Sequence, residues 1–405
     1  MPTFTYTARG RDGKKVTGTL TTESRQAVTQ MLMSRGLTAD SIQAVTGAQS
    51  GKKQGRTDRK IKTSELLVFT RQLSTIVSAG LPLLQGLDIL AEQTEDANFA
   101  AVINAIGQDV ESGSSFSEAL RKYPQVFPDL YVSMVRAGEA GGDLDGVLLQ
   151  LADYLESMAE LRRRIKSAMT YPVAALSLIL LISAGLVVWV VPQFQEIFST
   201  LDAQLPKPTL ILIATSNVLR SWKVLIVLGV FVGIILAIRA YGATATGRYN
   251  LDALKLRIPI FGQLQRKVSI SRFTRTLSAL TRSGVAILQA LEIVERTAGN
   301  EVFARIVAHA GDSVRSGQTL AEPLSRSDQF PPMVTRMIAV GEKTGALETM
   351  LNKISDFYDS EVKATVDSMT SLIEPVLIMM MGIIVGGIVL ALFLPIFSMS
   401  QHINK

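Results

Sequence analysis

Residues 69–80, FTRQLSTIVSAG, decide the organisation of this chain, because they occur in it twice. The second copy is residues 273–284, FTRTLSALTRSG, in which six of the twelve positions are identical. The two copies begin 204 residues apart. This period is far longer than that of a solenoid, whose units repeat about every 20–50 residues. The sequence therefore predicts a duplicated domain.

Each copy is predicted to open with an amphipathic helix. Phe69, Leu73, Ile76 and Gly80 recur at helical spacing and fall on one face, on which the three apolar side chains are expected to pack inward. Gly284 is the counterpart of Gly80 in the second copy. A later turn is repeated 203 residues apart, and its shared positions are Gly138, Glu139, Gly142, Gly341, Glu342 and Gly345. Short connections between helices of this kind are typical of compact all-α bundles.

The composition excludes several kinds of active site. The chain has 405 residues, no cysteine and two histidines. Disulfides, thiolate metal sites and cysteine nucleophiles are therefore excluded, and a Ser-His-Asp triad is not expected. Glu139, Asp143 and Asp145 lack the ligand spacing of a calcium loop, so helix capping is favoured over metal binding for these carboxylates. The sequence predicts no catalytic residue, no cofactor and no metal site.

The N-terminal part differs in pattern from the repeats. Residues 1–45 alternate between polar and apolar around turn residues, which predicts a small ββαβ module. Residues 46–62 are rich in glycine and basic residues, and we expect a solvated linker; contact with anionic lipid or with an acidic partner is the alternative. The first 20 residues contain no apolar segment of a signal peptide, so the N-terminus is expected in the cytoplasm.

Two uncharged apolar runs are framed by prolines at the same spacing. The framing residues are Tyr171, Pro172 and Pro192 for the first run, and Glu374, Pro375 and Pro395 for the second. The 20 residues from proline to proline span about 30 Å as a helix, the thickness of a bilayer core. A third apolar run, residues 224–238, reaches the lower limit for a span with its flanking residues. The expected transmembrane helices are residues 171–192, 222–240 and 374–397.

Basic residues predict the orientation of these spans. A basic patch precedes the first span and consists of Arg162, Arg163, Arg164 and Lys166. Cytoplasmic loops carry an excess of Lys and Arg. We therefore expect helical bundles at residues 63–170 and 241–373 in the cytoplasm. A loop at residues 193–221 and a tail at residues 398–405 are expected in the periplasm.

Two features of the third span allow alternative interpretations. Glu374 lies at its mouth, where a carboxylate can anchor the helix at the headgroups or contact a partner helix. Gly382 and Gly386 form a GxxxG pattern, which allows close approach of two helices. The second helix could belong to this chain, to another subunit or to a partner protein.

Taken together, these motifs resemble one family, the inner-membrane platform proteins of type IV pilus and type II secretion machines. The motifs are FTRQL…SAGLPLL at 69–84, FTRTL…RSGVAIL at 273–288, RIKSAMTYP at 164–172, IPIFG at 258–262 and LPIF at 394–397. The resemblance covers nearly the whole chain. The expected fold class is an all-α membrane protein with two homologous cytoplasmic bundles, three transmembrane helices and a small N-terminal α+β module.

The resemblance implies a non-enzymatic assembly platform in the bacterial inner membrane. The implied partners are a cytoplasmic hexameric ATPase, the transmembrane helices of pilins or pseudopilins, other inner-membrane assembly components, further copies of the chain and membrane lipid, but no nucleic acid. The alternatives are the F component of a type II secretion system rather than a pilus protein and, more distantly, a membrane transporter.

Overall fold

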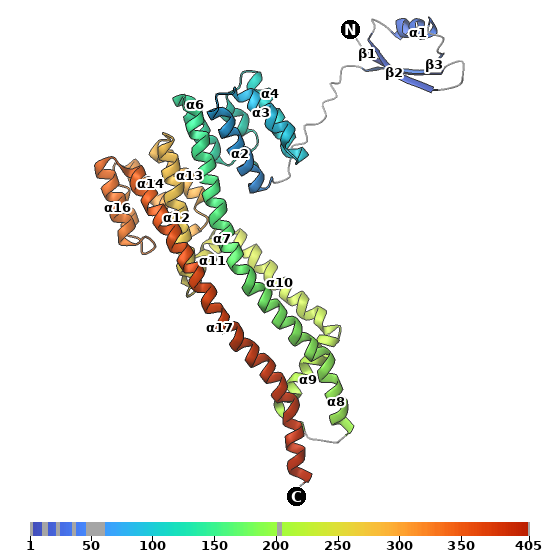
Figure 1. Ribbon diagram of the computed structural model, residues 1–405, viewed down its shortest axis with the longest axis vertical. Helices are drawn as coiled ribbons and strands as arrows, with labels where there is room; N and C mark the ends of the chain where they lie inside the picture. The colour runs from blue at the N-terminus through green and yellow to red at the C-terminus, as the bar shows by residue number, and fades with distance from the viewer. Residues whose placement is uncertain are drawn as a thin grey trace. The chain divides into compact units, whose positions relative to one another are not determined.

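The computed structural model describes residues 3–9, 15–21, 25–34, 38–45, 61–200 and 205–403 (Figure 1). Backbone contacts divide the chain into two units, Met1–Lys60 and Ile61–Lys405. Most of the predicted basic linker, residues 46–60, lies outside the described residues.

The N-terminal unit contains a small antiparallel sheet and one helix. Its elements are β1 (Thr3–Arg9), β2 (Lys15–Thr21), α1 (Arg25–Ser34) and β3 (Thr38–Val45). The strand order is β2-β1-β3, so β1 is the central strand. Ala8 on β1 and Val28 on α1 are fully buried, and the sheet therefore has one face that packs into a small core.

The first bundle packs its helices around three aromatic rings. Its helices are α2 (Thr63–Ser78), α3 (Leu83–Gln93), α4 (Ala97–Glu111), α5 (Phe116–Arg121), α6 (Asp129–Gly141) and the first part of α7 (Leu144–Gly185). The ring of Phe69 meets those of Phe99 and Phe127 edge-on, with centroids 5.4 and 6.1 Å apart. Edge-to-face contacts of this kind add to the hydrophobic gain of burial.

The second bundle repeats this arrangement. Its helices are α12 (Phe261–Arg282), α13 (Ile287–Thr297), α14 (Glu301–Arg315), α15 (Ala321–Ser325), α16 (Pro332–Thr344) and the first part of α17 (Leu347–Ile403). Phe273, Phe303 and Phe330 take the places of the three rings in the first bundle, and Phe330 lies 5.2 and 5.4 Å from the other two.

The two bundles share one continuous apolar core, because α7 of the first packs against α12 and α17 of the second. The hydroxyls of Tyr154 and Thr276 are 3.2 Å apart, and Ser283 donates to Gln150 at 2.9 Å. Thr276 is fully buried. Its counterpart in the first copy, Gln72, is exposed, so the two copies of the repeat have different surroundings.

In the described part of the chain, three helices are long and apolar enough to cross a membrane, which agrees with the number of spans predicted. The first is α7, which continues through a π-turn, η1 (Leu186–Val190), into α8 (Val191–Thr200); the others are α10 (Lys223–Ala243) and α17. Pro172 and Pro375 lie inside α7 and α17. The last helix of each bundle therefore runs into its span without a break (Figure 1).

Two further helices have no counterpart in the repeat. Helix α9 (Lys207–Arg220) begins after Pro206 and contacts η1, α8 and α17. Helix α11 (Ala245–Arg257) follows α10 and joins it to the second bundle. The buried carboxylate of Asp252 on α11 accepts the amide hydrogen of Glu301 at 2.9 Å. This contact joins α11 to the start of α14 in the second bundle.

Candidate functional site

The carboxylate of Glu139 holds the start of a short helix in the first bundle. Its Oε1 accepts the amide hydrogen of Phe116 at 2.5 Å, and its Oε2 accepts that of Ser117 at 3.0 Å. These amides lie in the first turn of α5, where a helix leaves its N–H groups without partners. A negative charge also interacts favourably with a helix N-terminus. Glu139 therefore joins the end of α6 to the start of α5.

Glu342 does the same in the second bundle. It accepts the amide hydrogens of Leu320 and Ala321 at 2.6 and 3.0 Å, at the start of α15. The glutamate of this turn therefore makes the same pair of hydrogen bonds in both copies of the repeat. In the first bundle, Asp143 is the N-cap of α7, and its carboxylate accepts the amide hydrogen of Gly146 at 3.2 Å. No group of acidic and histidine side chains in the described ranges could hold a metal ion.

The glycines of this turn are required by the backbone. Gly142 and Gly345 end α6 and α16 in the left-handed conformation, with φ of 71° and 70°. Glycine adopts that conformation without steric cost. A Cβ at Gly138 would lie 2.9 Å from Val147, and one at Gly341 would lie 2.9 Å from the Cα of Leu347. The repeated Gly-Glu motif thus closes a tight crossing between two helices.

The glycines that end the first helix of each copy are also matched. Gly80 and Gly284 both have positive φ, 85° and 79°. In both, a Cβ would meet no atom within 4 Å, so the backbone conformation alone selects glycine there.

The basic patch lies on the solvent-exposed side of α7, just before the first predicted span. Arg162, Arg163, Arg164 and Lys166 are all exposed. Arg164 pairs with Glu160 one turn earlier on the same helix. Exposed pairs of this kind add little stability, so the patch remains available to other negative charges.

The open surfaces of the spans are apolar. Helix α10 has no buried residue. Tyr171 and Glu374 are exposed where the predicted spans begin within α7 and α17. A Cβ built on Gly382 or Gly386 would meet no atom within 4 Å. The GxxxG face is therefore not used for packing within the described part of the chain.

A second GxxxG pattern is present in α10 and was not singled out from the sequence. Gly229 and Gly233 are spaced as Gly382 and Gly386 are, and a Cβ on either would also meet nothing within 4 Å. The spacing of glycines within the apolar run is the signal that could have found it.

Two hydroxyls of α9 donate to backbone carbonyls that lie about one turn before a proline, and no pattern in the sequence indicated these contacts. The amide of Val191 bonds to the oxygen of Leu186 in the π-turn, and the next residue, Pro192, has no amide hydrogen. The oxygen of Val187 is thereby left without a helical donor, and it accepts the hydroxyl hydrogen of the buried Ser216 at 2.6 Å.

The corresponding hydrogen bond occurs in the second repeated span. Pro395 cannot donate to the oxygen of Ala391 one turn earlier, and that oxygen accepts the hydroxyl hydrogen of the buried Thr209 at 2.5 Å. In a bilayer, such hydroxyls satisfy the backbone groups that prolines release. Helix α9 thus connects the far ends of both repeated spans.

Comparison with known proteins follows the boundaries of the repeat. Residues 69–192 and 273–395 each match the family described as type II secretion system (T2SS), protein F, and residues 1–43 match the N-terminal domain of type II secretion system protein F. The matches begin at Phe69 and Phe273, which open the duplicated stretch. The chain belongs to the type II secretion system protein F family. The predicted duplication and the predicted family are thereby confirmed.

Relatives in this family resemble the chain over its whole length. The chain is 43% identical to the type IV pilus assembly protein PilC of Thermus thermophilus, over 98% of each chain. It is 38% identical to the PilC of Myxococcus xanthus, over 99% of this chain and 96% of the relative. It is 34% identical to the type II secretion system protein F of Pseudomonas aeruginosa, over the full length of both.

Proposed function

We propose that this chain is a non-enzymatic inner-membrane platform of a type IV pilus machine. It would couple a cytoplasmic hexameric ATPase to the insertion of pilin subunits into a fibre or to their removal from it. The observation that carries the proposal is that the last helix of each bundle continues unbroken into an apolar span. A continuous helix transmits displacement along its axis, so a motor acting on the bundles could move groups at membrane depth.

The proposed topology follows the basic residues. The bundles at residues 63–170 and 241–373 lie in the cytoplasm with the N-terminal α+β module (1–45) and its linker (46–62). The spans are residues 171–192, 222–240 and 374–397. The loop at residues 193–221 and the tail at residues 398–405 lie in the periplasm. Because the chain has no cysteine, one cysteine at Lys207 or at Lys255 reports sidedness directly. Labelling of Lys255→Cys by an impermeant reagent in intact cells would overturn this topology.

The proposed coupling has a direct test in the exposed segment of α7 between bundle and span. Ser167 and Thr170 are exposed there, and glycine in a helix interior costs about 0.5–1 kcal/mol relative to alanine. The double change to glycine should soften the helix while the bundle still retains the ATPase in a pull-down. Fibre assembly should fall, whereas the matched double change to alanine should preserve both. Equal fibre assembly by the two variants would refute mechanical coupling through α7.

We also propose that the open GxxxG face of α17 receives a helix of another subunit or of a pilin. The support is that a Cβ built on Gly382 or Gly386 would meet no atom of the described residues within 4 Å, whereas Ile384 packs against the core between η1, α9 and α17. On oxidation in membranes, two copies of a Gly382→Cys variant should form a disulfide-linked dimer if the second helix belongs to another subunit. If it belongs to a pilin, the disulfide should form with a pilin that carries an engineered cysteine in its transmembrane helix. Ile384→Cys is the control that should not cross-link.

A role in type II secretion is the second candidate, and the sequence identities to named relatives favour the pilus. Two relatives named as pilus assembly proteins are 43% and 38% identical to the chain, and a relative named type II secretion system protein F is 34% identical. Deletion of the gene should abolish surface fibres and leave exoprotein secretion intact. Loss of secretion with normal fibres would select the alternative. Robust solute uptake by the purified chain in proteoliposomes would instead indicate a transporter.

A further inference from the structure

Large apolar side chains are exposed in one short segment where α11 meets α12. They are Leu254 in the last turns of α11, and Ile258, Ile260 and Phe261 in the turn that follows it. Pro259, within the same turn, is also exposed. We call residues 258–261 the elbow. Because these residues are consecutive, their exposed side chains form one apolar surface.

The backbone of the elbow is strained at Ile260. Its φ and ψ are 68° and −58°, and in the described ranges it is the one residue other than glycine with positive φ. The amide of Phe261 donates to the oxygen of Pro259 at 2.8 Å across it, which closes a γ-turn of the strained kind. Glycine would adopt this conformation without a steric cost. The isoleucine side chain is 44% exposed, so packing within the chain does not explain why it stands there.

The contacts between α12 and α17 place the elbow at the mouth of the third span. Arg275 of α12 pairs with Asp359 of α17. Lys267, earlier on α12, donates to Thr365, later on α17, at 2.8 Å, so the two helices are antiparallel. Helix α12 begins six residues before Lys267, about 9 Å closer to the span, and Glu374 lies nine residues after Thr365, about 14 Å along α17. The elbow therefore lies within about two helical turns of the level of Glu374.

Helix α11 places the elbow near the end of the second span as well. The side-chain amide of Asn250 donates at 2.9 Å to the hydroxyl of Tyr241, which lies in the last turn of α10. A Cβ built on Gly242 would lie 3.0 Å from the side chain of Leu251, so α11 packs directly against the end of α10. The elbow begins seven residues after Leu251, about 10 Å along the helix. Contacts to two different spans thus place it at the same boundary.

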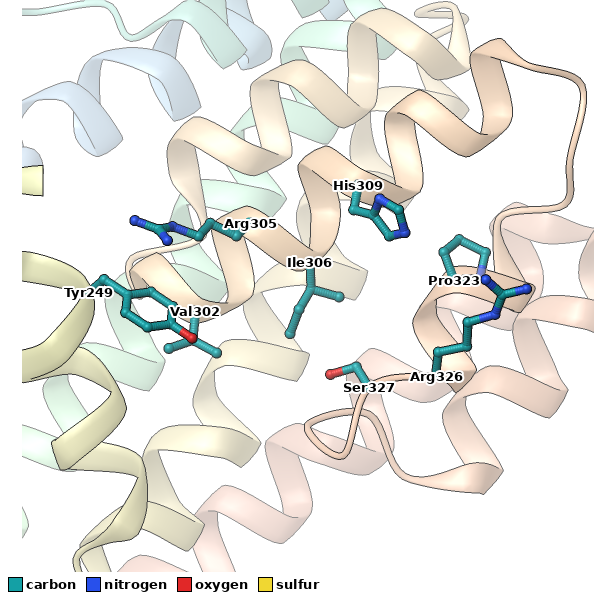
Figure 2. A pocket seen from close by; sticks show the side chains of 8 residues that line it. All are labelled: Tyr249, Val302, Arg305, Ile306, His309, Pro323, Arg326 and Ser327. Carbon is teal, nitrogen blue, oxygen red and sulfur yellow. The ribbon is translucent and has the colours of Figure 1, made fainter. Parts of the chain in front are cut away.

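The second bundle holds α11 from another side. Figure 2 shows an open cleft of about 270 Å³, lined by α11, α14 and the segment around α15. At one end of it, the guanidinium of Arg305 on α14 lies over the ring of Tyr249 on α11, 4.2 Å from the ring centroid, which is a cation–π contact. His309 and Arg326 lie at the other end (Figure 2). Because α11 contacts both α10 and α14, the elbow at its end has a defined position.

We propose that the elbow inserts into the bilayer leaflet next to the bundles, at the boundary between headgroups and acyl chains. Apolar side chains are stabilised at this depth, and nearby basic residues are attracted to anionic headgroups. Arg248, Lys255 and Arg257 of α11 are exposed and provide such charges. Contact with lipid accounts for an exposed isoleucine at a position where the backbone favours glycine. The inference rests on the proposed spans lying in a bilayer, and not on coupling to an ATPase.

Because the chain has no cysteine, one nitroxide spin label can test this depth directly. Full-length Ile260→Cys is labelled and reconstituted in nanodiscs of phosphatidylethanolamine and phosphatidylglycerol. Collisions of the label are measured with oxygen, which concentrates in lipid, and with nickel ethylenediaminediacetate, which stays in water. We expect the ratio of oxygen to nickel collisions to be several times higher than for Val340→Cys. Val340 is the matched control, because it is 50% exposed on α16, which packs against the start of α17, about 40 Å from Glu374.

A label in the second span separates failure of the elbow from failure of the spans. Val232→Cys, in the middle of α10, should collide with oxygen and be shielded from nickel. If it is, and the label at Ile260 meets nickel as Val340 does, the elbow faces water and this proposal alone is overturned. Shielding of Ile260 from both reagents would show that protein, such as a second copy of the chain, covers the elbow, and would also overturn it. Exposure of Val232 to nickel would overturn the spans and the elbow together. Ile258→Cys provides a second label site in the elbow if Ile260→Cys does not fold.

Discussion

The hydroxyl of Ser216 donates to the backbone oxygen of Val187 at 2.6 Å. This oxygen has no helical donor, because Pro192 lacks an amide hydrogen. Thr209 lies two turns earlier on the same helix, and its hydroxyl donates to the backbone oxygen of Ala391, one turn before Pro395. One short helix therefore satisfies a proline-released carbonyl in each of the two repeated spans. Ser216 and Thr209 join spans that are about 200 residues apart in the sequence.

Removing either hydroxyl should loosen the far end of the spans. Thr209→Val leaves a buried carbonyl without a donor, and we expect it to lower the free energy of unfolding by about 1 kcal/mol, a typical value for a hydrogen bond inside a membrane protein. Ser216→Ala should act similarly. The measurement is denaturant unfolding in detergent micelles. Thr215→Val is the control, because Thr215 is exposed and bonds only within its own helix at 2.9 Å; an equal loss there would contradict the prediction.

The two turn glutamates should be equally important for stability. Glu139→Ala and Glu342→Ala each release two helix-start amides, at a cost of about 1–3 kcal/mol in the free energy of unfolding. Hydrogen exchange should speed up at Phe116 and Ser117 in the first variant. Glu111→Ala, at the exposed end of α4, should change neither quantity. An unchanged free energy of unfolding in either glutamate variant would contradict the capping role.

A buried tyrosine should make the first bundle sensitive to alkali. Tyr131 is 1% exposed, and burial raises the pKa of its hydroxyl, an effect that the hydrogen bond from Thr70 at 3.2 Å opposes. Because the folded pKa lies above the unfolded value, the neutral form stabilises the fold below about pH 10, and this contribution is lost as the pH rises further.

The matched variant isolates this contribution. Tyr131→Phe cannot ionise, so its free energy of unfolding should fall less steeply above about pH 10 than that of the natural chain, by up to about 1.4 kcal/mol per pH unit. Below pH 9 the difference between the two should be constant. Parallel curves throughout would show that Tyr131 does not control alkaline unfolding.

Substitution by alanine should change stability in opposite directions at two glycines of the second bundle. A Cβ at Gly341 would lie 2.9 Å from the Cα of Leu347, and we expect Gly341→Ala to cost about 1–3 kcal/mol as the helices separate. At Gly311, inside α14, the nearest atom would be 3.8 Å away, and alanine should stabilise the helix by about 0.5–1 kcal/mol. Thermal unfolding of the two variants in the same detergent gives the comparison.

Much of the fold could be read from the sequence because its signals are local or repeated. Duplicated residues such as Phe69 and Phe273 indicated two copies, and two apolar runs of span length between prolines indicated two of the spans. The roles of Gly142 and Gly345 followed from backbone geometry that glycine adopts most easily. The family could be recognised for the same reason, since its motifs are short and contiguous.

The sequence by itself determined the duplication, the three runs that are apolar enough to span a membrane, and the absence of cysteine chemistry. The tertiary structure alone decided which side chains meet. It buries Thr276 against Tyr154, pairs Ser216 with Val187, and brings Arg326, directly after α15, to the same cleft as His309 of α14. Periodicity specifies which face of a helix is apolar, but the partner of that face depends on packing between distant segments. Contacts of this kind leave no pattern in a single sequence, because neither residue indicates which distant residue it contacts.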